Sequence, residues 1–320
     1  MQNYVQGEII SPTSKFEALQ TSNGHALLFA MDTLGVLHVI EEQSGTSHAG
    51  WKIHDVSSRC IQTQFPRQES DTKLRTFNVG QSAVDGTIGL AMPVNLDGND
   101  HLLMSLGNSS DDMSWVASPT WTIVPFDPAD EQPQKIVITG TLFAEPQDNT
   151  KTQYLVVDID RPSENTADPH IARYHIDSAR NNGHYWVKHD ATVDILAVEY
   201  QSVMGRVSGK HVDGIYTAGH TGTAAQLIYD PVIDWYGNAT VTPIILQLPG
   251  GTIPSAIATA RVIDGSADLY AISGSTLYRF PSDEQEGNNE PKALVTSDLL
   301  AGTDTLRAMT HEGVTTLWGR

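Results

Sequence analysis

Short apolar segments recur along the chain at similar intervals, with starts separated by 75, 52, 60, 54 and 47 residues. The copies lie at residues 28–32, 103–107, 155–159, 215–219 and 269–273, with a shorter sixth copy at 316–319. Repeats of about 40–50 residues that each hold several short strands are typical of β-propellers. The pattern therefore predicts an all-β fold of the propeller type, which is a scaffold for sites rather than a function.

Further strands are expected on either side of each copy. An apolar segment precedes most copies, as at 87–92 and 257–262, and its small residues suit an innermost strand where blades converge. Turn formers such as the pair Asn23-Gly24 separate the two segments, and Asx-Gly pairs favour tight hairpins. A third strand follows, as at 276–280. The repeat unit is thus predicted to be a blade of four antiparallel strands.

The last repeat reaches only its second strand at Arg320, so it forms about half a blade. Residues 4–10 could supply an outer strand and close the ring, because soluble proteins avoid open sheet edges. This count predicts six blades in a single propeller domain over residues 1–320. A five-bladed ring is the alternative if the N-terminal segment does not pair.

Composition agrees with one globular chain of 320 residues, of which 39% are hydrophobic. No segment approaches the roughly 18 uninterrupted apolar residues of a membrane-spanning helix. Residues 1–8 have neither a basic start nor an apolar core, so no secretory signal is expected and a cytoplasmic or leaderless protein is predicted. The single cysteine, Cys60, excludes an internal disulfide framework. A net charge of −19 repels phosphate backbones and argues against nucleic acid as a partner.

One repeat contains a more specific signature. The segment 31–38 places Asp32 before a glycine and an apolar pair that precedes His38, and Gly50-Trp51 follows. This arrangement resembles the tectonin-type lectin propellers, and the resemblance implies glycan binding. Tryptophan faces stack on the apolar side of sugar rings, so five tryptophans are candidate ligand-binding residues; packing between blades is the alternative for each. They are Trp51, Trp115, Trp121, Trp186 and Trp235.

Metal binding is not predicted, and no cofactor is expected. The turns at 95–100 and 264–268 look like degenerate calcium loops of integrin-type propellers, but calcium prefers six to eight oxygen ligands and these loops offer few. Ordinary hairpin turns are the favoured interpretation. Histidines such as His184 and His189 are five residues apart, which places them on opposite faces of a strand and argues against zinc.

Four charged residues interrupt inner strands that are otherwise apolar or small: Glu17, Glu199, Arg261 and Arg307. Because an unpaired buried charge is costly, we expect them to line a wet axial tunnel and orient a polar ligand, or to pair across blades. His220, in a Gly-rich segment read as a flexible loop, is a further candidate for hydrogen-bonding a ligand.

These observations favour a non-enzymatic recognition module for a carbohydrate, a glycoconjugate or a small polar ligand. No nucleophile elbow, phosphate loop or dinucleotide motif occurs in context. One alternative is a propeller enzyme, a hydrolase, lyase or isomerase, with its site at one end of the axial tunnel. Glu199 or His220 would act as the base, and Arg261 or Arg307 would stabilise negative charge. Another is a protein-interaction platform in a larger toxin-like or adhesin-like assembly. The sequence leaves the oligomeric state open.

Overall fold

The structure is a computed structural model. It describes residues 16–21, 23–32, 36–43, 50–56, 77–81, 88–96, 99–117, 119–129, 136–144, 152–159, 170–176, 185–193, 196–207, 210–221, 224–232, 244–261, 267–281, 290–311 and 313–320. The chain divides into two compact units, one formed by Met1–Glu164 with Ala172–Ala191 and the other by Asn165–Ile171 with Thr192–Arg320. Each unit is described by itself below.

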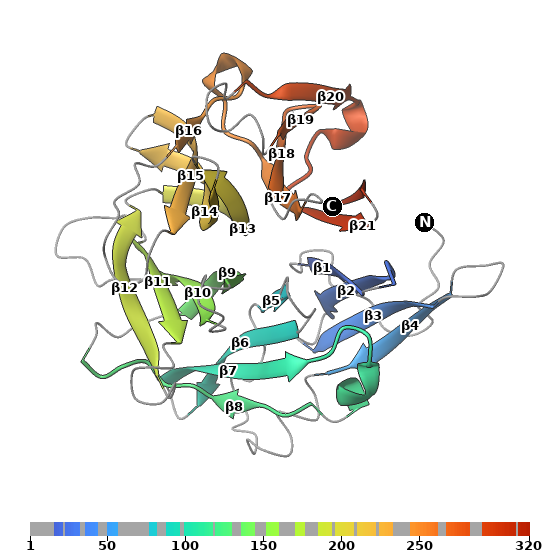
Figure 1. The fold of residues 1–320 in the computed structure, drawn as a ribbon, viewed down its shortest axis with the longest axis vertical. Coiled ribbons are helices and arrows are strands. Elements are labelled where there is room, and N and C mark those ends of the chain that lie inside the picture. The colour runs from blue at the N-terminus through green and yellow to red at the C-terminus, as the bar shows by residue number, and fades with distance from the viewer. Residues whose placement is uncertain are drawn as a thin grey trace. The chain divides into compact units, whose positions relative to one another are not determined.

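The first unit holds three four-stranded sheets, apart from the first residues of β11 (Figure 1). Within each sheet, strands that follow one another in sequence lie side by side. Sheet I consists of β1 (Phe16–Gln20), β2 (Ala26–Met31), β3 (Leu37–Gln43) and β4 (Gly50–Asp55). Sheet II consists of β5 (Asn78–Gln81), β6 (Ile88–Leu96), β7 (Asn99–Asn108) and β8 (Thr122–Ile123). Sheet III consists of β9 (Ile136–Ala144), β10 (Thr152–Ile159), β11 (His170–Ile176) and β12 (Trp186–Val193).

The second unit repeats this arrangement in sheets IV and V and contains the hairpin of sheet VI. Sheet IV consists of β13 (Leu196–Val207), β14 (Lys210–Thr221), β15 (Ala224–Val232) and β16 (Ile244–Leu246). Sheet V consists of β17 (Ala256–Arg261), β18 (Ala267–Ser273), β19 (Thr276–Phe280) and β20 (Lys292–Thr296). Sheet VI consists of β21 (Leu306–His311) and β22 (Val314–Gly319). Short 3-10 turns at η1 (Met113–Ala117), η3 (Pro249–Gly251) and η4 (Asp298–Leu300) are the helical segments of the described residues.

The predicted blade unit of four consecutive strands is confirmed, with one error of register. Five of the six repeated segments lie on the second strand of their sheet, but residues 103–107 lie on β7, the third strand of sheet II. Residues 87–92, expected to be innermost, fall on the second strand, β6. The first strand of sheet II, β5, has only four residues, and Val79 is the one large apolar residue among them, so the strand lacks an apolar run. Second strands start at 26, 88, 152, 210, 267 and 314, which gives more even spacings of 62, 64, 58, 57 and 47 residues.

Neighbouring sheets cover each other's apolar faces within each unit. Alternate residues Leu27 and Phe29 of β2 are fully buried against Leu90 and Met92 of sheet II. In the second unit, one face of sheet V packs on Leu246 of sheet IV, and its other face packs on sheet VI. Because side chains of a strand alternate between faces, each sheet can bury both sides in this way.

The small residues predicted on inner strands have a packing role. Ala256, Ala258 and Ala260 lie on one face of β17 and are at most 2% exposed. They contact a cluster that includes Tyr270 of β18 and Leu306 of β21. Their short side chains allow β21 to lie close to β17, as the sequence predicted for strands that converge.

Tight turns join the paired strands where the sequence predicts them. Gly24, between β1 and β2, has a φ of 82°, and Gly313, between β21 and β22, has a φ of 79°. A positive φ is strained for residues with a Cβ atom, which explains glycine at both positions. The turns at Asp97-Gly98 and Asp264-Gly265 lie outside the described residues. Residues 4–10 also lie outside the described residues. Closure of the ring by this segment and the count of six blades therefore stay predictions.

The outer strand of sheet V, β20, has an irregular edge. All five of its residues are exposed, including Leu294 at 50%. In its pairing with β19, Leu277 lies opposite Val295 and Tyr278 lies opposite Ala293, so Leu294 is an extra residue in a β-bulge. Bulges of this kind are common at sheet edges, where they interrupt the regular ladder.

None of the helical segments that the structure describes has the length and apolarity needed to cross a membrane.

Candidate functional site

Trp51 on β4 is the candidate tryptophan with the greatest exposure among those whose side chains are described, at 37%. The register of β3 and β4 places it directly opposite Glu42. Directly opposed residues in an antiparallel pair have Cβ atoms about 4.5–5.5 Å apart. The backbone N–H of Ala26 donates a hydrogen bond of 2.9 Å to Oε2 of Glu42, which holds this carboxylate in place. Trp51 and Glu42 therefore form an aromatic and carboxylate pair at the outer side of sheet I.

The cationic side chains of β4 lie on the other face of the sheet. Lys52 and His54 alternate with Trp51 along the strand, and Lys52 lies opposite Glu41 in the register. His54 Nε2 lies 3.0 Å from Oε2 of the same glutamate. The carboxylate of Glu42 thus lies beside Trp51, and the contact of Glu41 with His54 lies on the other face of β3 and β4.

Trp115 and Trp121 are packing residues in the connection between β7 and β8. Trp121 is 4% exposed and belongs to the core between sheets I and II. Half-buried Trp115 packs against the same core, and its Nε1 donates a hydrogen bond of 2.9 Å to the carbonyl oxygen of Ser109. The packing alternative therefore fits Trp121, whose ring faces are covered. Trp186 is the first residue of β12, with its side chain outside the described part, and Trp235 lies outside the described residues.

Asp32, in the segment that resembles the tectonin signature, is used to build a turn. Its Oδ1 accepts a hydrogen bond of 3.0 Å from the backbone N–H of Val36, at the connection of β2 and β3. Its Oδ2 lies 3.0 Å from Nε2 of His38, which is 1% exposed. The motif residues Asp32 and His38 thus stabilise sheet I, and Trp51 is the exposed member of the motif.

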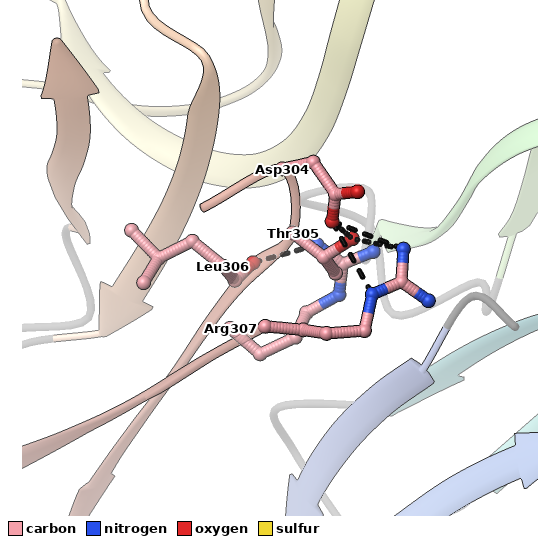
Figure 2. Close-up of polar contacts among 5 residues, drawn as sticks. Asp304, Thr305, Leu306 and Arg307 are labelled. Carbon is pink, nitrogen blue, oxygen red and sulfur yellow. Dashed lines mark hydrogen bonds and ion pairs between the residues drawn. The ribbon is translucent and has the colours of Figure 1, made fainter. Parts of the chain in front are cut away.

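Arg307 is buried at the inner strand of sheet VI (Figure 2). It is 5% exposed, and its Nη1 donates a hydrogen bond of 2.6 Å to the carbonyl oxygen of Leu306. Leu306 packs toward sheet V, so Arg307 lies on the opposite face of β21, across from Trp318 of β22. Arg307 is therefore a buried charge, and whether it lines a tunnel or pairs across blades stays a prediction.

Beside Arg307, Asp304 and Arg320 form a partly exposed ion pair. Arg320 Nη2 lies 3.0 Å from Oδ1 of Asp304, and the hydroxyl of Thr305 donates a 2.9 Å hydrogen bond to the same oxygen. Burial acts to raise the pKa of Asp304, but the hydrogen bonds from Arg320 and Thr305 and the charge of Arg320 outweigh it. The pKa of Asp304 is consequently lowered from its ordinary value of 3.8.

The other charged candidates lie on the first strands of their sheets, and their role toward a ligand stays a prediction. Half-buried Glu17 is on β1, Glu199 is on β13 and Arg261 ends β17. The side chains of Glu199 and Arg261 lie outside the described part. Glu199 lies opposite Ala218, two residues from His220 along β14.

His220 lies in β14, opposite Leu196 and Ala225, and the expectation of a flexible loop is wrong. The strand continues through the segment 218–221 because its glycine and small residues are tolerated in a ladder that pairs on both sides.

A further polar pair, Asp268 with Arg279, was not recognised as a unit from the sequence. Asp268 is 3% exposed, and its Oδ2 accepts a hydrogen bond of 2.7 Å from Nε of Arg279. The Arg279 side chain is 37% exposed. The pairing accounts for Asp268, which ends the turn at 264–268 that looks like a degenerate calcium loop. The pair of Asp268 and Arg279 depends on the register of β18 and β19, which brings the two residues together and which the sequence does not show.

Within the part of the chain that the structure describes, no group of three or more His, Cys, Asp or Glu residues is placed to hold a metal ion. Of the other calcium candidates of the two turns, Asp97 and Asp264 lie outside that part, while Asn99 and Asp100 lie on β7 with their side chains outside it.

Comparison with solved structures establishes the fold class. The chain is similar to AofleA from Arthrobotrys oligospora, solved as a mutant in which three arginines are replaced by alanine. The TM-score is 0.54, and the sequences are 8% identical over 92% of this chain and 76% of that one. It is also similar to the Aleuria aurantia lectin in complex with Fucα1-6GlcNAc, with a TM-score of 0.54 and 14% identity over 98% of this chain and 90% of that one. The fold is an all-β propeller built from antiparallel four-stranded sheets.

No family model and no curated protein matches the sequence.

Proposed function

We propose that the chain is a non-enzymatic recognition module that binds a carbohydrate or glycoconjugate. The observation that carries the proposal is the exposed indole of Trp51 directly opposite the anchored carboxylate of Glu42. A sugar ring has an apolar face that stacks on an aromatic ring and a rim of hydroxyl groups that donate hydrogen bonds. The pair supplies a partner for each of these features.

The likeness to the Aleuria aurantia lectin supports this function as an analogy. That protein is seen with a fucosylated disaccharide, and it shares the fold of this chain. A fold hosts many functions, so the local chemistry of Trp51 and Glu42 has to carry the assignment. A single shallow aromatic platform gives weak binding, in the range of about 0.1–1 mM for one site.

The test is a glycan array followed by calorimetric titration of the best glycan at millimolar concentration. We expect the wild type to bind. Trp51→Ala should lose at least about tenfold in affinity, because stacking on an aromatic ring is worth about 1–3 kcal/mol. Trp51→Phe should retain most of the affinity, because it still presents an aromatic face. Leu299→Ala is the matched control, since Leu299 is an exposed apolar residue of η4 on another sheet connection, 92% exposed. Wild type that binds no saccharide would remove the proposal, and equal loss in the control would remove the site.

A further inference from the structure

We infer that the pair of Trp51 and Glu42 selects neutral or amine-bearing sugars and discriminates against sugars that carry sulfate or carboxylate groups. This inference rests on the proposed function and adds the chemical class of the ligand. It follows from what Glu42 can do as a hydrogen-bonding group and from which charges share the face of Trp51.

Glu42 offers acceptors to a ligand that stacks on Trp51. An ionised carboxylate has about four lone-pair sites and no donor. One of its oxygens, Oε2, accepts from the backbone N–H of Ala26 at 2.9 Å, so the carboxylate is fixed while acceptor capacity remains. A ligand group beside the ring must therefore donate, as a hydroxyl or an ammonium group does. A sulfate ester or a carboxylate can only accept, and it would meet a like charge.

The charges of the neighbouring strands reinforce this selection. The residues of β3 and β4 that share a face with Trp51 include Glu42 and Asp55. His38, on the same face, is 1% exposed and is paired with Asp32, so it presents no cation at the surface. The basic residues Lys52 and His54 lie on the opposite face. On these two strands, the carboxylates of Glu42 and Asp55 are therefore on the face of Trp51, and Glu42 is the one directly opposite its ring.

The expected discrimination is local and of moderate size. At an exposed site, where the effective dielectric constant lies between about 40 and 80, two like charges about 6 Å apart repel enough to change a binding constant by about three- to tenfold. The net charge of −19 adds a weaker, longer-range repulsion that salt screens beyond about 8–10 Å. The contribution of Glu42 should therefore persist at 150 mM salt, where the general repulsion is reduced.

The test uses an array of neutral glycans that end in galactose, glucose or N-acetylglucosamine, each printed beside its 6-sulfated counterpart, at 150 mM salt. Wild type prefers the neutral member at least about threefold. Glu42→Gln, which keeps an acceptor for Ala26 and adds a donor, brings the ratio close to one. Glu41→Gln is the matched control: it removes the same charge one residue away on the opposite face, retains an acceptor for His54, and leaves the ratio unchanged.

Three other outcomes are decisive. Wild type that binds sulfated glycans as well as neutral ones overturns the inference and leaves the proposed function intact. The same conclusion follows if Glu42→Gln keeps the wild-type ratio, or if Glu41→Gln shifts it equally, provided that urea unfolding shows both variants to be folded. Absence of binding to every glycan overturns the proposed function and this inference together.

Discussion

Nε2 of His38 lies 3.0 Å from Oδ2 of Asp32, and the two side chains are only 2% and 9% exposed. The second oxygen of Asp32 accepts from the backbone of Val36, so one carboxylate ties β2, the turn and β3 together. This places a polar connection beside the apolar core of sheet I. The loop signature that resembles a lectin motif thereby also has a structural purpose.

Replacement of Asp32 should destabilise the fold. In Asp32→Ala, His38 and the backbone N–H of Val36 both lose their acceptor in a buried place, and we expect a loss of about 2–4 kcal/mol in the free energy of unfolding. Asp32→Asn retains an acceptor for Val36 and should lose less. Urea unfolding followed by circular dichroism measures the difference. Equal stability of wild type and Asp32→Ala would show that the turn does not need this carboxylate.

Two arginine–aspartate pairs allow a comparison of buried and exposed ion pairs. The carboxylate that bonds to Arg279 is 4% exposed, whereas the one that bonds to Arg320 is 66% exposed. Arg279→Ala removes a charged partner from a buried carboxylate and should reduce stability by about 3 kcal/mol. Arg320→Ala should cost less than about 1 kcal/mol, because water solvates its partner. Parallel denaturant titrations decide, and a larger loss in Arg320→Ala would contradict the argument.

The ion pair of Asp304 with Arg320 should depend on acid pH. The folded-state pKa of Asp304 lies below its ordinary value of 3.8. The stabilisation is therefore present above that value and is lost as the pH falls through the lower, folded-state pKa. A carbon-13 titration of the Asp304 carboxyl group should show a midpoint below 3.8 in wild type and a higher midpoint in Arg320→Ala. An unchanged midpoint would mean that Arg320 does not set it.

Asn108 should be a structural residue even though it begins the tripeptide Asn-Ser-Ser of a glycosylation sequon. It is 8% exposed, and its Nδ2 donates to Oγ of Ser105 at 3.0 Å and to the carbonyl oxygen of Ile88 at 3.4 Å. Asn108→Ala should lower the unfolding free energy by about 1–2 kcal/mol, since the bond to Ile88 connects β7 to β6 and the bond to Ser105 lies within β7. Thermal melts of wild type and Asn108→Ala measure the loss, and equal stability would contradict a structural role.

The sequence predicted the elements that apolar spacing controls. Five of the six repeated segments and the alanines of β17 lie in the expected strands, because burial on both faces of a sheet imposes a local pattern. The inner strand β5 was missed since four residues with one large apolar side chain give no such pattern. An error of one strand in sheet II followed, and it made the repeat spacing look irregular.

The candidate site was predictable only in part, for a physical reason. Trp51 was found because a tryptophan in a repeat motif is rare and chemically distinctive. Glu42 and Arg279 were missed, since their importance depends on the cross-strand register, which places Glu42 opposite Trp51 and Arg279 near Asp268. The sequence likewise could not show that Trp121 would be covered by sheets I and II, because its burial depends on contacts distant in sequence.

The extra residue Leu294 in β20 has a consequence for the behaviour of concentrated protein. A β-strand from another molecule could approach this exposed edge. It could form regular backbone hydrogen bonds with only about one or two residues of β20 before the bulge disrupts the register. Continuous growth of a sheet from copy to copy is therefore disfavoured at β20. The kink lets the molecule keep exposed leucine and valine side chains on this strand without offering a template for fibrils.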